Sequence, residues 1–298
     1  MEDITIRNWK EGDDENIYKL FDRTCRWLSN EAYANKFNDK GLKPEGIILA
    51  EKDGLIIGHV MGNWTDIMYE GKPTKFAGIG QVMVDENFRG YGIGKAMLKK
   101  IIDYHISGNC RGIILWTQKT LVPAYPMYQK LDFQPVVNRA FYRFRPKTTT
   151  SSLSVEPYRP SMGKEAEKVR IEWMHSCFPV GVNNMKPGSG NCWVLCKNKK
   201  VIGYFCKWEN DGVATINSAV SFIENASEMC SAVIGFLKAY GYKEVVWQTC
   251  AGSIWQKKLN NLVQYEEELL ADVRMCKSIG SPINIERLLP EFDGCSTW

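Results

Sequence analysis

The sequence predicts a mixed α+β fold made of two similar halves, each a mostly antiparallel sheet flanked by helices. Short apolar stretches with the period of strands alternate with amphipathic stretches that have the period of helices. A polar segment at residues 145–152 separates two such series, and the second series repeats the order of the first. We therefore expect two domains, at residues 1–146 and 153–298.

Composition and charge narrow the classes of protein to consider. The 298 residues are 44% hydrophobic and 24% charged, which is typical of a globular chain. The net charge of +4 is spread along the sequence without a polybasic block, so we expect no nucleic-acid partner. The sequence has no apolar run of membrane-spanning length and starts with an acidic segment, so we expect a cytoplasmic protein without a membrane partner. The cysteines lie in apolar stretches without the spacing of a zinc site, which predicts reduced thiols and no metal.

In the first half, a hairpin is predicted around Asp53-Gly54, because Asp-Gly supplies the positive φ of a tight turn. Apolar residues spaced at three and four positions predict a helix after a glycine-rich turn. The loops around residues 24–45 and 62–75 are expected to contact the second substrate. The predicted elements are strands at 47–51, 55–61 and 78–84, a helix at 94–105, a strand at 113–116, a short helix at 125–131 and a strand at 139–144.

The second half repeats this plan with weaker motifs. A hairpin is predicted at residues 192–197 and 201–208. Further along, Trp247-Gln248-Thr249 stands in the place of Trp116-Thr117-Gln118. Likewise, Trp255 stands in the place of Tyr128. These correspondences indicate a duplicated domain.

The glycine-rich turn predicts a site for a pyrophosphate. It lies between a strand that ends at Val84 and the amphipathic helix, and the first N–H groups of a helix lack intrahelical partners and favour an anion. A dinucleotide-binding fingerprint would need glycine where Lys95 stands, and a Walker A loop would need Ser or Thr where Ala96 stands. The predicted cofactor-binding residues of this turn are Arg89, Gly90, Tyr91, Gly92, Ile93, Gly94 and Lys95.

Two segments resemble the GNAT superfamily of N-acetyltransferases. Residues 82–94 resemble its hydrophobic strand followed by Arg/Gln-x-x-Gly-x-Gly/Ala, and residues 124–133 resemble its later alanine and tyrosine motif. Asp132 replaces the usual glycine of that motif, and Leu121 stands where an asparagine is common. The resemblance is strong over residues 1–145 and implies two tandem GNAT-like domains, similar to mycothiol synthase and the enhanced-intracellular-survival acetyltransferases.

The resemblance implies acetyl-CoA as cosubstrate and assigns roles to further residues. The backbone of Val82, Met83 and Val84 would pair with the pantetheine amides, and a backbone N–H would stabilise charge on the thioester oxygen. Tyr128 would be the catalytic general acid that protonates the departing thiolate. The general base stays open between a relayed water and four side chains, those of Asp85, Glu86, Asp66 and His59.

The second half is expected to be catalytically silent. Its corresponding turn, Ser221–Ser227, has no arginine and no glycine and carries a carboxylate. The resemblance to tandem relatives implies that the second half instead walls off the acceptor pocket. The carboxylate of Trp298 is a further candidate base. The predicted activity is acetyl transfer to a primary amine of a small-molecule acceptor. The alternatives are a CoA-binding regulatory protein and a protein N-acetyltransferase, and a homodimer is left open.

Overall fold

The computed structural model describes residues 3–24, 42–70, 72–174 and 191–284. Within these ranges the second half repeats the element order of the first. The first half consists of β1 (Ile4–Asn8), α1 (Asp14–Thr24), η1 (Pro44–Gly46), β2 (Ile47–Lys52), β3 (Leu55–Tyr69), β4 (Lys72–Val84), η2 (Glu86–Phe88), α4 (Ile93–Ser107), β5 (Gly112–Gln118), α5 (Ala124–Gln129) and β6 (Gln134–Phe144). The second half consists of β7 (Ser154–Pro157), η3 (Pro160–Met162), α6 (Gly163–Met174), β8 (Cys192–Lys197), β9 (Lys200–Asn210), β10 (Val213–Ser221), η4 (Ile223–Asn225), α7 (Ala226–Ala239), β11 (Glu244–Cys250), α8 (Ile254–Asn260) and β12 (Glu266–Ser278).

The predicted strands and helices of both halves are confirmed, and strands β3, β4 and β6 are longer than predicted. The turn between β2 and β3 is at Asp53-Gly54, with φ of 50° and 77°. The prediction of a loop at residues 62–75 was wrong, because β3 and β4 continue as a long hairpin with Asp66 in register with Lys75. Most of the predicted loop at 24–45 lies outside the described residues.

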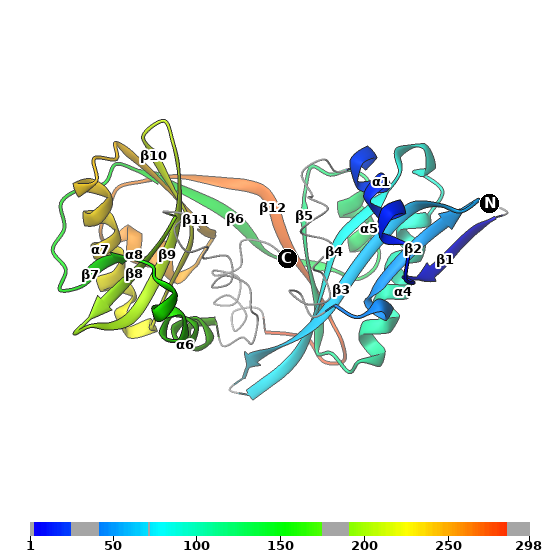
Figure 1. Cartoon of the computed structure of the whole chain (residues 1–298), viewed down its shortest axis with the longest axis horizontal. Coiled ribbons are helices and arrows are strands. Elements are labelled where there is room, and N and C mark those ends of the chain that lie inside the picture. Colours follow the sequence, from blue (N-terminus) through cyan, green and yellow to red (C-terminus); the bar gives the residue numbers. More distant parts are fainter. Residues whose placement is uncertain (1–2, 25–41, 71, 175–190, 285–298) are drawn as a thin grey trace.

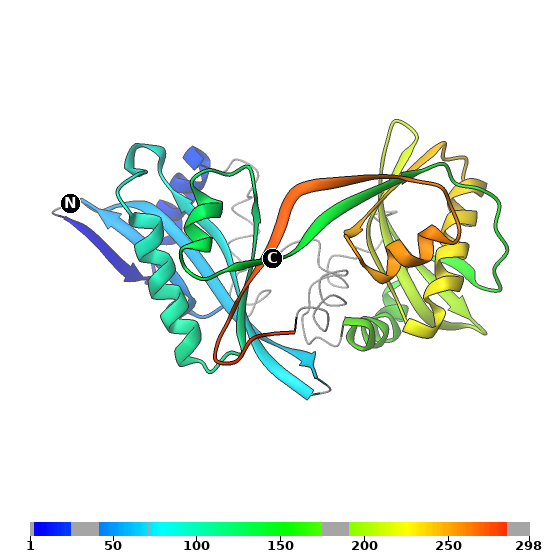
Figure 2. The ribbon, with the colours of Figure 1, turned by 180° about the vertical axis from the view of Figure 1, so that it is seen from behind.

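Each sheet half is covered on both faces. In the first half, α1 covers the face seen in Figure 1, and α4 and α5 cover the face seen in Figure 2. The apolar face predicted for α4 is confirmed, since Ile93, Met97, Leu98, Ile101 and Ile102 are all buried. No helix in the described ranges is long and apolar enough to cross a membrane.

All the strands of the described residues belong to one 12-stranded sheet, in which the two halves exchange their last strands. The order is β1-β2-β3-β4-β5-β12-β6-β11-β10-β9-β8-β7. Thus β12 lies between β5 and β6, and β6 pairs with β11 of the second half, so both strands run between the halves (Figure 1). Val273 and Met275 of β12 are buried in the core under α4, whereas Tyr142 of β6 belongs to the core of the second half. The sheet therefore crosses the predicted domain boundary at residues 147–152, and that boundary stays a prediction.

Candidate active site

Strands β4 and β5 separate into a wedge near the middle of the first-half sheet. They pair in parallel only where residues 77–79 meet residues 113–115. Beyond that point β4 continues to Val84, and β5 continues to Gln118 with β12 as its neighbour on the other side. The backbone edge of β4 from Gly80 to Val84 is thus open toward β5 among the described residues.

The register of β3 and β4 shows which backbone groups face this wedge. Asp85 N–H donates to the Ile57 carbonyl at 2.9 Å, and Met83 is the register partner of His59. Because hydrogen-bonded and non-hydrogen-bonded pairs alternate along antiparallel strands, Met83 directs its backbone groups toward β3 and Val84 directs its own toward the wedge. The Val84 carbonyl accordingly accepts from Arg89 Nε at 3.0 Å. The predicted pantetheine-binding strand therefore has an accessible polar edge.

The glycine-rich turn brings an open helix N-terminus to the end of β4. Gly90 and Gly92 have φ of 86° and 79°, and space is open around both Cα atoms where a side chain would project. Helix α4 starts at Ile93, whose side chain is buried in the core. The N–H groups of its first turn point out of the helix without intrahelical partners, which is the arrangement that binds phosphate groups. The side chain of Lys95 is exposed beside them.

Gly94 is the point at which the predicted parts of the site come together. A Cβ at this position would lie 3.6 Å from Val84 Cγ2 and 3.7 Å from the Met127 sulfur. The helix N-terminus therefore touches both β4 and α5, the short helix that carries Tyr128. Tyr128 is 5% exposed and packs edge-on against Phe133, with ring centroids 6.1 Å apart. Burial raises the pKa of Tyr128 to about 12, so its hydroxyl stays protonated near neutral pH.

The two departures from the family motif have structural explanations. Asp132 has a φ of 66°, the left-handed conformation for which glycine is usual, and its carboxylate accepts from Lys277 Nζ of β12 at 3.1 Å. The Leu121 side chain is 49% exposed in the segment after β5, so it offers apolar contact where an asparagine would offer hydrogen bonds.

The candidate general bases differ in their hydrogen-bond partners, exposure and position. Asp85 accepts from Arg23 Nε at 2.9 Å and caps η2 through Asn87 N–H at 3.1 Å. Burial alone would raise the pKa of Asp85, but these partners outweigh burial and lower it. Glu86 is exposed on η2, and Asp66 lies seven residues from His59 along β3, about 23 Å away at the rise of a strand. The carboxylate of Trp298 lies outside the described residues.

Sequence reasoning missed a bulge in β4 at the wedge. The register with β3 shifts between His59 and Met61, and Gln81 has a φ of 51°. The Gln81 side-chain oxygen is buried and has no hydrogen-bond partner in the described part of the chain. Gly80, a glycine inside a strand, was the signal that could have indicated this bulge.

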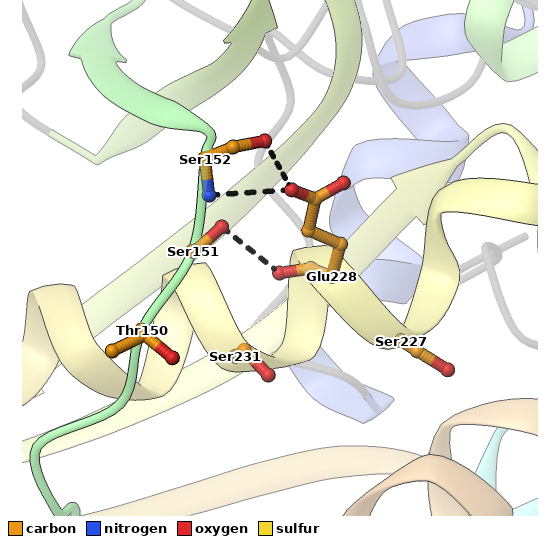
Figure 3. Close-up of a pocket in the computed structure, with 6 residues that line it drawn as sticks. All are labelled: Thr150, Ser151, Ser152, Ser227, Glu228 and Ser231. Carbon is orange, nitrogen blue, oxygen red and sulfur yellow. Dashed lines mark hydrogen bonds between the residues drawn. The ribbon is translucent and has the colours of Figure 1, made fainter.

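The second half has the same wedge without the phosphate-binding turn. Strands β10 and β11 pair in parallel from Val213 to Ile216, and the register with β9 then shifts. At the first turn of α7, a pocket is lined by Thr150, Ser151, Ser152, Ser227, Glu228 and Ser231 (Figure 3). There the Glu228 carboxylate accepts from Ser152 N–H at 3.2 Å and from Lys197 Nζ at 3.2 Å. The first turn of α7 therefore carries a carboxylate held by two partners, where the first turn of α4 carries the exposed Lys95.

Fold and site together define an acyltransferase of the GNAT type, and comparisons with known proteins agree. Residues 14–133 match the acetyltransferase (GNAT) family. An uncharacterised N-acetyltransferase of Archaeoglobus fulgidus is 28% identical over 140 residues, which are 44% of this chain and 93% of that protein. The mycothiol acetyltransferase of Acidothermus cellulolyticus is 23% identical over 154 residues, 45% of either chain.

Solved structures share the fold over nearly the whole chain. A conserved protein from Enterococcus faecalis V583 has a TM-score of 0.71 at 16% identity and covers 92% of this chain and 72% of its own. A GCN5-related N-acetyltransferase from Kribbella flavida has a TM-score of 0.71 at 13% identity, with 92% and 70% covered. Residues 14–133 therefore form a GNAT acetyltransferase domain, and the solved structures show that the shared fold extends over the second half.

Proposed function

We propose that this enzyme transfers the acetyl group of acetyl-CoA to a primary amine of a small-molecule acceptor, by direct attack within a ternary complex. The observation that carries the proposal is the meeting of three parts at Gly94: the open edge of β4, the uncapped N-terminus of α4 and the helix that carries Tyr128. Acetyl-CoA supplies an activated acyl thioester, and no covalent intermediate on a side chain is required.

The residues of the turn are proposed to bind the pyrophosphate. Backbone N–H groups between Arg89 and Lys95 would donate to its oxygens, with help from the helix dipole. Arg89 already donates to the Val84 carbonyl, so we assign it to ordering the turn in addition to neutralising charge. Lys95 and Lys99 are both exposed and can reach a further phosphate.

The residues of the wedge are proposed to orient the thioester and to complete the transfer. The backbone of Val82 to Val84 would pair with the pantetheine amides as an added strand would. Tyr128 would then protonate the departing thiolate, because a phenol that stays protonated near neutral pH can donate to it. Asp85 is committed to Arg23 and to η2, so we propose that water removes the proton of the amine.

The first test is calorimetric titration of acetyl-CoA into the wild-type protein and into Gly92→Asp. Gly92 has positive φ and lies beside the free N–H groups, so aspartate would add both strain and repulsion of a phosphate. We expect at least a tenfold loss of affinity, which is the scale of one lost charge-assisted contact. The matched control is Asn225→Asp at the start of α7, which should bind acetyl-CoA as the wild type does.

The second test measures thiol release against a panel of small amines and lysine peptides. Release with a small amine supports the proposal. Release with peptides alone would favour a protein N-acetyltransferase, and binding without release on any amine would favour a regulatory CoA-binding protein. A wild-type protein that does not bind acetyl-CoA would overturn the proposal.

A further inference from the structure

His59 is a buried polar side chain of the first half for which the proposed mechanism has no role. It lies on β3 with 0% exposure, and its ring packs edge-on against Phe21, with centroids 5.3 Å apart and planes at 87°. Its Nδ1 lies 3.1 Å from the Gln81 carbonyl oxygen. A carbonyl oxygen only accepts, so Nδ1 carries the hydrogen in this contact.

The contact is made at the bulge, where β4 lacks the regular ladder that would otherwise fix its peptide groups. The register shifts beside His59, and Gln81 takes a left-handed backbone conformation with φ of 51°. Such a conformation is costly for a residue other than glycine and persists only when its surroundings hold it. The imidazole of His59 is one such restraint.

Because one peptide group contains both the Gln81 C=O and the Val82 N–H, holding the C=O also fixes the direction of the N–H. The Gln81–Val82 peptide is trans, so its C=O and N–H point in opposite directions. The C=O is held on the side of His59. The Val82 N–H therefore points to the other side, where pairing between β4 and β5 has already ended at Ile79.

We propose that His59 is a positioning residue: by holding the Gln81 carbonyl it aims the Val82 N–H at the carbonyl oxygen of the acetyl thioester. This rests on the proposed function, because it needs acetyl-CoA in the wedge. The Val82 N–H then stabilises the negative charge that develops on that oxygen during attack. Donation from His59 to the same peptide group also polarises it, which makes its N–H a stronger donor.

The test uses the full-length protein and three variants. His59→Leu fills the space but cannot donate, whereas His59→Asn keeps a donor near the position of Nδ1. Ile47→Ala removes a buried side chain of the same core, on β2 and in register with Met61 instead of His59, so it controls for lost stability. The primary readout is the infrared stretch of the carbonyl of isotope-labelled acetyl-CoA bound to each protein, since a hydrogen bond to this carbonyl lowers its frequency.

We expect the bound carbonyl frequency to lie below that of free acetyl-CoA in the wild type, in His59→Asn and in Ile47→Ala. In His59→Leu it should return toward the free value. Acetyl-CoA affinity should stay near that of the wild type, because the turn at α4 is unchanged. With an acceptor amine, kcat of His59→Leu should fall about 100-fold while KM for acetyl-CoA changes little, as for loss of one oxyanion donor.

Equal carbonyl frequencies in His59→Leu and the wild type would overturn the inference. So would a return of the frequency toward the free value in Ile47→Ala, because the effect would then follow stability and not the contact. If the wild type does not bind acetyl-CoA, the proposed function fails first, and calorimetry separates that outcome from the other two.

Discussion

Helices α4 and α7 start at the same place in the repeated element order, but their first turns differ. The turn before α4 has two glycines with positive φ and leaves its N–H groups exposed. The turn before α7 has no glycine, and Glu228 in the first turn of α7 accepts from Ser152 (Figure 3). Glu228 also accepts from Lys197. Both halves keep a wedge between parallel strands. The comparison shows that the framework of the fold can be retained when the groups proposed to bind an anion are replaced.

The largest effect, a loss of cooperative folding, is expected when the first half is produced without the second. A chain cut after residue 146 lacks β12, which leaves the edge of β5 unpaired and removes Val273 and Met275 from the core under α4. We expect no cooperative thermal unfolding of this fragment by circular dichroism.

Adding residues 266–284 as a separate peptide should restore a cooperative transition, because it supplies the missing strand. A fragment that unfolds cooperatively without the peptide and binds acetyl-CoA would show that the first half is complete without the exchanged strand.

A smaller effect, confined to turnover, is expected at the paired positions Tyr128 and Trp255. Tyr128→Phe removes the proposed acid and should lower kcat about 100-fold, the low end for general acid catalysis, without changing acetyl-CoA affinity. Because burial raises the pKa of Tyr128 to about 12, the wild-type rate should not fall between neutral and mildly alkaline pH through ionisation of this group.

Trp255→Phe is the matched control in the second half, where the indole is fully buried. It should lower the melting temperature and leave kcat unchanged. Full turnover in Tyr128→Phe would exclude the proposed acid, and a large loss of kcat in Trp255→Phe would contradict the expectation that the second half is silent.

The smallest effect, on the free energy of unfolding, is expected from substitution of Asp85, which links α1 to the end of β4. Asp85→Asn should lower the free energy of unfolding by about 1 kcal/mol at pH 7, since it removes a partly exposed ion pair and weakens a cap. The pKa of Asp85 is lowered in the folded state, so its contribution is present above the unfolded pKa of about 3.9 and is lost as pH falls below it.

Urea unfolding of the wild type and Asp85→Asn at pH 7 and at pH 3 measures this difference. The neighbouring exposed carboxylate gives the control, because Glu86→Gln should be nearly neutral at both pH values. A stability loss in Asp85→Asn that persists undiminished at low pH would contradict the assigned role.

Local sequence patterns predicted the elements of the site well. The spacing of Ile93, Met97 and Leu98 specifies one helix face, and Asp53-Gly54 specifies a turn, because both signals depend only on neighbours in the chain. These signals also indicated the turn before α4. They could not show that Gly94 touches Met127, because that contact depends on how distant elements pack.

The exchange of β6 and β12 could not be predicted from the sequence. The strand pattern at Arg139–Phe144 indicates an extended segment but says nothing about which strand lies beside it. The β4 bulge was missed for a related reason: the contact between the Gln81 carbonyl and His59 depends on the register between two strands. The partnership of Asp85 with Arg23 likewise joins residues 62 positions apart, beyond the reach of any local pattern.

The place of β12 also sets the order in which this protein can mature. The ribosome makes the chain from its N-terminus, yet Leu115 and Trp116 of β5 pair with Met275 and Arg274, which are synthesised more than 150 residues later. The acetyltransferase half therefore cannot close its sheet while the second half is still being made. Until β12 is available, the apolar edge of β5 is exposed to other chains, so completion of the second half protects the first from aggregation.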